Sequence, residues 1–169
     1  MGLISLLYDP NLNLIHTSHV PTPYFHQKHV LGQARLSNNG QLIFTAKKIE
    51  KGKGRFSEIF LNTQSKFSDS LIQQKIDIGD HYIEEVTIKI DNLNSQLIAN
   101  GFYFQKNKKS PDGLYTSIIK ADDLSIVSSH FIEDINDPEK DSASDESDDN
   151  DLKNLTIRDI ILKKDGSFL

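Results

Sequence analysis

Four histidines within 14 residues form the group of side chains best suited to chemistry in this chain. His16, His19, His26 and His29 follow the spacing H-x2-H-x6-H-x2-H, which leaves only two histidines elsewhere. Neutral imidazoles bind zinc, copper or nickel, so this cluster could hold a divalent metal. Side chains three residues apart on an extended strand point to opposite faces, however, and two prolines interrupt the segment. Solvated histidines in a surface connection are the alternative that we favour.

A second group of side chains that could bind cations is the acidic stretch from Glu133 to Asp151. It contains ten acids and one base, a net charge of −9, whereas the other 150 residues carry 14 acids and 18 bases, a net charge of +4. Carboxylates bind calcium, but this stretch lacks the central glycine and the final glutamate of an EF-hand loop. Because its centre has a single aliphatic side chain, Ala143, it cannot bury enough apolar area to fold. We therefore predict a disordered acidic insert over residues 133–154.

The remaining residue types offer no recognisable catalytic set. The chain has no cysteine, which excludes disulfides, thiolate metal sites and cysteine nucleophiles. It also has no serine-hydrolase elbow, no H-E-x-x-H pair and no glycine-rich phosphate loop, and Asp122 and Asp123 fit a solvated turn. Lys106, Lys108 and Lys109 fit a protected hairpin tip better than a nucleic-acid surface. The sequence favours a protein that is not an enzyme and has no nucleic-acid partner.

The elements that must position these residues are predicted to be strands. Apolar and polar residues alternate over short runs that are bounded by turn residues. The clearest runs are 41–46, 86–90, 97–104 and 114–119. A helix is considered only for residues 68–75, and no apolar run approaches the ~18 residues of a membrane-spanning helix. The chain is therefore expected to be all-β.

The strand pattern repeats along the chain. Residues 33–44 align with residues 85–99 and with residues 157–169, and in each segment a strand enters a polar turn that is followed by an apolar pair. Three other segments, which start at Leu3, Glu58 and Leu114, also resemble one another. The acidic insert falls between the second and third copies of the first motif. These matches predict repeated four-stranded antiparallel units.

The repeat divides residues 1–169, a single β-repeat region, into five parts. They are the second half of a unit with a connection (1–31), a unit (32–80), a second unit (81–132), the acidic insert (133–154) and the start of a further unit (155–169). Because such a cut leaves open edges, we expect a fragment of a longer chain that self-associates. No signal peptide is recognised, which leaves the location unknown and a secreted or periplasmic parent open.

The motifs Asn39-Gly40-Gln41-Leu42 and Asp165-Gly166-Ser167-Phe168 carry a resemblance to a known architecture. With them the chain resembles β-propeller repeat proteins, which are built from four-stranded antiparallel units. The resemblance implies a partial propeller of about three units, and a β-sandwich or an open β-meander is the alternative fold.

The resemblance also implies a function. It implies a non-catalytic interaction module that binds a protein or a glycan, although fold alone does not determine function. One alternative is part of a propeller-fold hydrolase or lyase whose axial site lies mostly outside this chain. The other is a metal-binding protein built on the histidine cluster, and a divalent metal is the one cofactor considered.

Overall fold

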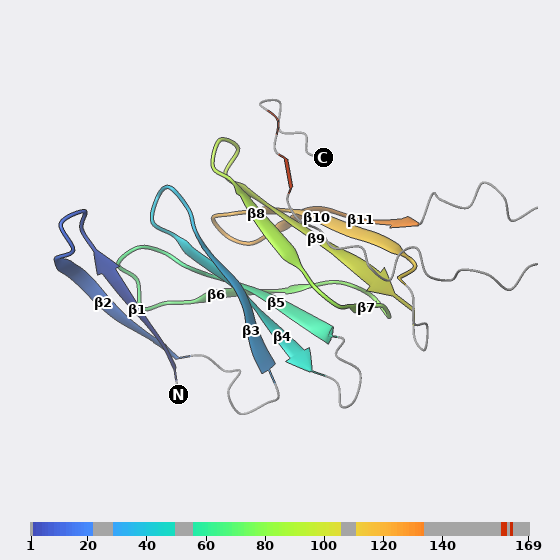
Figure 1. Cartoon of the computed structure of the whole chain (residues 1–169), viewed down its shortest axis with the longest axis horizontal. Helices are drawn as coiled ribbons and strands as arrows, with labels where there is room; N and C mark the ends of the chain where they lie inside the picture. Colours follow the sequence, from blue (N-terminus) through green and yellow to red (C-terminus); the bar gives the residue numbers. More distant parts are fainter. Residues whose placement is uncertain are drawn as a thin grey trace, which may run out of the picture.

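The structure is a computed structural model that describes residues 2–21, 29–49, 56–105, 111–133, 160–161 and 163. Within these ranges the chain forms eleven strands and no helix, which confirms the all-β prediction (Figure 1). Every strand pairing is antiparallel. No helix in these ranges has the length and apolarity to cross a membrane. The predicted acidic insert and the segment after it lie outside the described residues, except for positions 133, 160, 161 and 163.

The amino-terminal hairpin is a two-stranded sheet of its own. It consists of β1 (Gly2–Tyr8) and β2 (Leu14–Pro21), which pair with each other and with no other described strand. The turn between them is closed by Asp9, whose side chain accepts hydrogen bonds from the backbone of Asn11 and Asn13. Such side-chain turns are the usual role of aspartate between two strands.

The next four strands form a meander in which each strand pairs with its successor. They are β3 (His29–Leu36), β4 (Leu42–Ile49), β5 (Phe56–Gln64) and β6 (Ile72–Ile76). The predicted helix over 68–75 is wrong, because β6 occupies its second half and pairs with β5 from Ile72 to Ile76. Long-range pairing outweighs the weak local helix preference of this stretch.

A second meander has the same strand order. It consists of β8 (Thr87–Asp91), β9 (Gln96–Phe104), β10 (Gly113–Lys120) and β11 (Ile126–Glu133). The short strand β7 (Tyr82–Ile83) pairs with β5 on one side and with β9 on the other. Through β7 the two meanders form one nine-stranded sheet.

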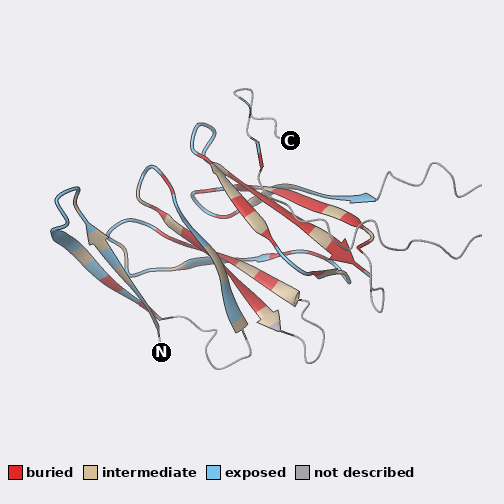
Figure 2. Ribbon diagram, in the orientation of Figure 1, coloured by how far each residue is buried: buried red, intermediate tan, exposed pale blue. Residues whose placement is uncertain are grey.

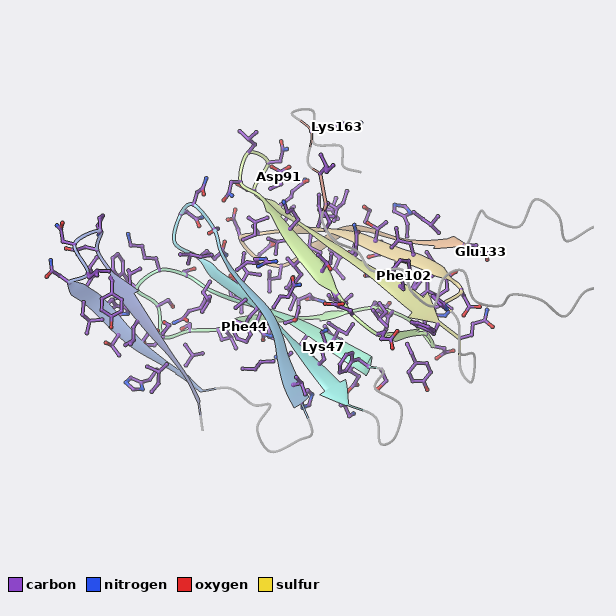
Figure 3. All side chains as sticks on the ribbon, viewed as in Figure 1. Phe44, Lys47, Asp91, Phe102, Glu133 and Lys163 are labelled. Atoms are coloured by element: carbon purple, nitrogen blue, oxygen red, sulfur yellow. The ribbon has the colours of Figure 1, made fainter. Side chains whose placement is uncertain are left out.

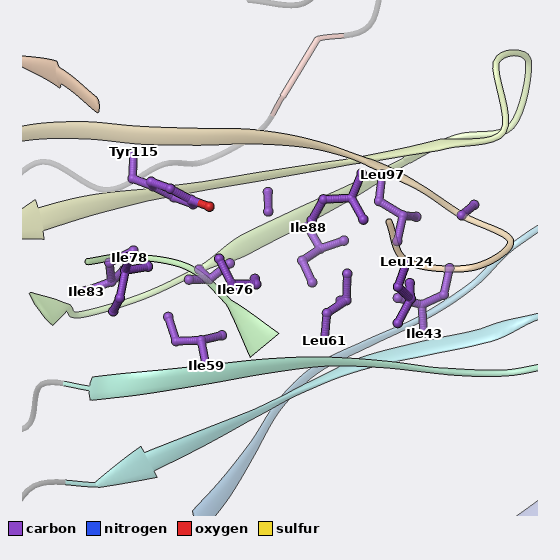
Figure 4. Close-up of a cluster of buried hydrophobic side chains, with 14 of the residues drawn as sticks. Ile43, Ile59, Leu61, Ile76, Ile78, Ile83, Ile88, Leu97, Tyr115 and Leu124 are labelled. Carbon is purple, nitrogen blue, oxygen red and sulfur yellow. The ribbon is translucent and has the colours of Figure 1, made fainter. Parts of the chain in front are cut away.

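The main hydrophobic core lies between the two meanders (Figure 4). The first meander contributes Ile43, Ile59 and Leu61, and the second contributes side chains such as Leu97 and Tyr115. These five residues are fully buried. Figure 2 shows the same distribution, with buried residues concentrated on β4, β5, β9 and β10. Period-two alternation produced these apolar faces, and burying them against each other stabilises the fold.

The β1–β2 hairpin lies against the first meander. Ser18 and Val20 of β2 are buried, and the Gln64 side-chain amide of β5 donates a hydrogen bond to the Ser18 hydroxyl. The His16 ring meets the Phe67 ring edge-on, with 5.5 Å between ring centroids. The molecule is therefore a stack in which the first meander lies between the hairpin and the second meander (Figure 1).

Candidate interaction surface

The structure separates the histidines that the sequence grouped. His16 is on the inward face of β2 with the buried Ser18, whereas His19 is exposed on the opposite face. His29 is on β3, where its ring lies 5.9 Å from the Phe60 ring, and His26 lies outside the described residues. Among the described residues, no group of three or more His, Cys, Asp or Glu side chains could hold a metal ion.

The carboxylate pair Asp122–Asp123 serves the turn between β10 and β11. The Ser125 amide donates a 2.8 Å hydrogen bond to Asp123 Oδ1. Hydrogen bonds from the Ser125 side chain and backbone lower the pKa of Asp123, and both aspartates are exposed. This arrangement matches the solvated turn predicted from the sequence.

Lys47 on β4, labelled in Figure 3, is a charged residue that is buried. Its Nζ lies 4.8 Å above the centroid of the Phe56 ring, a cation–π distance. Burial lowers the pKa of Lys47, and the charge of Glu85 partly opposes this effect. The sequence spacing could have predicted this burial, because Lys47 follows Ile43 and Thr45 at alternate positions and alternate residues of one strand share a face.

The outward face of β1 carries three large apolar side chains. Ile4, Leu6 and Tyr8 alternate along the strand and are 59%, 51% and 48% exposed. They lie on the face opposite the one that holds Ser18 and Val20 against the first meander. Isolated exposed apolar residues are common on protein surfaces, but an aligned row of three on one strand forms a patch.

The ladder of β1–β2 is the same as the ladder of β10–β11. In β1–β2 six successive pairs run from Gly2↔Pro21 to Leu7↔His16, and after a register shift one more pair follows. In β10–β11 six pairs run from Gly113↔Glu133 to Ile118↔Ser128, and a register shift and one more pair follow here too. The two hairpins are therefore geometrical copies, with Gly2 at the position of Gly113.

This correspondence shows what the exposed row is in the other hairpin. Counted from the two glycines, Ile4, Leu6 and Tyr8 match three residues of β10 that are almost completely buried. These are Tyr115 (0% exposed), Ser117 (1%) and Ile119 (0%). Tyr115 and Ile119 belong to the core between the meanders. The exposed row of β1 thus has the position, within its hairpin, of a face that another sheet covers elsewhere in the same molecule.

Comparison with family models, curated proteins and solved structures found no match for this chain. The fold and the exposed row therefore carry the functional interpretation.

Proposed function

We propose that this chain is a non-catalytic interaction module built from β-propeller-type repeat units, and that the outward face of β1–β2 receives a β-unit of a protein partner. The single observation that carries the proposal is the correspondence of Ile4, Leu6 and Tyr8 with Tyr115, Ser117 and Ile119. An apolar face that is buried in one hairpin and exposed in its counterpart indicates a contact surface for another sheet.

The direction of stacking supports the proposal. The hairpin lies on the first meander through the face with Ser18 and Val20, and the first meander lies on the second through the face with Ile43 and Leu61. Each layer thus uses one face towards the next layer along the chain. The row of Ile4, Leu6 and Tyr8 is the outer face of the first layer of this stack, and it stays exposed.

The expected gain from covering the row is moderate. Each of the three side chains is about half exposed, and complete burial of a large apolar side chain contributes about 1.5–3 kcal/mol. Burial of the remaining halves then contributes roughly 3 kcal/mol in total, before the entropy cost of association. This size fits a reversible contact that needs additional interactions to become tight.

Sedimentation velocity of the full chain tests the proposal. The wild-type protein is expected to associate with itself as its concentration rises, because a second copy offers β-units that can cover the row. The double variant Ile4→Lys/Leu6→Lys is expected to remain monomeric. Val127→Lys is the matched control, since Val127 is 52% exposed on β11 and lies away from the row. A monomeric wild type, or equal association of all three proteins, would contradict the proposal.

One observation favours a second function, the metal-binding alternative. The Nε2 atom of His16 is buried and has no hydrogen-bond partner among the described residues. An imidazole nitrogen in this condition is suited to a metal ligand. Elemental analysis of protein purified without a histidine tag is expected to find zinc or nickel if this function holds. Equal melting temperatures with and without a chelator would exclude it.

A further inference from the structure

The edge of β1 differs from the edges of the corresponding strands in both meanders. β10 pairs with β11 on one side and with β9 on the other, where all eight residues from Gly113 to Lys120 have partners. In the first meander, β5 lies in the same way between β4 and β6. Among the described strands, β1 pairs with β2 alone. The edge of β1 that does not face β2 corresponds to the edge of β10 that pairs with β9.

We infer that this edge of β1 is an acceptor site for a strand of the β9 type, supplied in antiparallel orientation by a protein partner. The inference rests on the proposed function and identifies the element through which the partner binds. Addition of a strand to an exposed sheet edge is an established mode of peptide recognition, in which backbone hydrogen bonds give affinity and side-chain positions give specificity.

The register of the added strand follows from the ladder between β9 and β10. Tyr103 lies opposite Gly113, Gly101 lies opposite Tyr115, and Leu97 lies opposite Ile119. Transferred to β1, these pairs place an aromatic residue opposite Gly2, a small residue opposite Ile4 and an aliphatic residue opposite Tyr8. Gly2 corresponds to Gly113, which is the residue opposite Tyr103.

The small residue opposite Ile4 has a counterpart in both meanders. In the second meander it is Gly101, whose position has no room for a Cβ atom because the Glu85 carbonyl oxygen would lie 2.4 Å away. In the first meander Ala46 lies opposite Phe60 in the same way. The two counterparts of Ile4, Tyr115 and Phe60, therefore lie opposite glycine and alanine. In the second meander this size limit is set by Glu85 and Ile83, which belong to the meander itself, so for a strand bound to β1 we expect the alternation of β9 without a strict size limit opposite Ile4.

A synthetic peptide of residues 95–105 of this chain, with lysines added at both ends for solubility, is the probe. Its binding to the full chain is measured by fluorescence anisotropy, and its position by hydrogen–deuterium exchange. We expect saturable binding with a Kd on the order of 10 μM, and a loss of about tenfold or more for the same peptide with Asn100→Pro/Gly101→Pro. One of two adjacent backbone N–H groups of a strand points to its pairing partner, and the two prolines remove both. Exchange is expected to slow in residues 2–8 and to stay unchanged in β3, β6, β8 and β11, the edge strands of the two meanders.

Three results would overturn the inference. They are the absence of saturable binding, equal binding of the Asn100→Pro/Gly101→Pro peptide, and protection of another edge strand in place of β1. Faster exchange in β10 would also overturn it, because the peptide would then be displacing β9. If the peptide fails while the chain still associates through Ile4 and Leu6, only the strand-acceptor site is wrong. If the peptide binds β1 while the chain stays monomeric, the proposed stacking function is wrong.

Discussion

Replacement of Gly101 by alanine tests the close packing that determines the register of β9. Gly101 lies in the middle of β9, opposite Tyr115 of β10. A Cβ atom at Gly101 would lie 2.4 Å from the carbonyl oxygen of Glu85 and 2.8 Å from Cγ2 of Ile83. Because real Cβ contacts shorter than 3.0 Å essentially do not occur, the backbone near Glu85 would have to move by about 0.6 Å.

The magnitude follows from two opposing effects. Overpacking of a close-packed interior costs about 1–3 kcal/mol, and Ile83 is completely buried within the core. Alanine also restricts the unfolded chain more than glycine does, which raises the free energy of unfolding by about 0.4–1 kcal/mol. We therefore expect Gly101→Ala to lower the free energy of unfolding by about 1–2 kcal/mol, and the melting temperature by about 3–6 °C.

Chemical denaturation and calorimetry measure this change, and Gly32 provides the matched control. A Cβ atom at Gly32 would lie 2.1 Å from Thr45 Oγ1, which is a side-chain atom that can be removed. Gly32→Ala should therefore be rescued by Thr45→Ala, whereas Gly101→Ala should not be rescued by Ile83→Ala because the Glu85 carbonyl remains. Stability of Gly101→Ala within about 0.5 kcal/mol of wild type would refute the reasoning, as would its rescue by Ile83→Ala.

Two further predictions concern charged residues. Hydrogen bonds and ion pairs from Lys48 (2.8 Å) and Lys75 (3.0 Å) lower the pKa of Glu58, so its ionised form stabilises the folded state above about pH 4.5. We expect Glu58→Gln to lower the free energy of unfolding by about 0.5 kcal/mol at pH 7, and to be as stable as wild type once the pH falls below the lowered pKa. A difference in unfolding free energy that stays constant as the pH is lowered would contradict this. Burial lowers the pKa of Lys47, so the unfolded state binds more protons and wild-type stability should rise as the pH increases from the lowered pKa to about 10.5. Lys47→Met should accordingly be about 1 kcal/mol more stable than wild type at pH 7, and this difference should disappear at high pH. A variant that is less stable than wild type at pH 7 would contradict this, because the contacts of Lys47 with Phe56 and Glu85 would then outweigh the cost of its burial.

Strand identity was largely predictable from the sequence. The runs at 41–46, 86–90, 97–104 and 114–119 lie on strands to within one residue, since alternation with period two is a local pattern. The run at 68–75 was predicted wrongly, because residues 68–71 lie outside regular secondary structure and the pairing partner of β6 lies in β5. Local preference could not reveal that partner.

Sequence alignment located the repeated hairpins to within one residue. The match between the segments starting at Leu3 and Leu114 places Ile4 opposite Tyr115, as the two ladders do. The match starting at Glu58 places Ile59 opposite Tyr115, whereas the sheet register assigns Phe60 to that position when Leu42 is matched with Leu97. A shift of one residue exchanges the two faces of a strand, so this small error reverses which side chains meet the neighbouring sheet.

The sequence by itself determined that the chain is all-β, where most strands run, and which residues alternate on each face. These properties depend on neighbours a few positions apart. Only the tertiary structure decided that His16 and Lys47 turn inward, and that Ile4, Leu6 and Tyr8 stay exposed while their counterparts on β10 are buried. The two hairpins share one ladder, and whether a face is covered depends on the sheet that packs against it. That contact joins residues far apart in the chain, which no local pattern records.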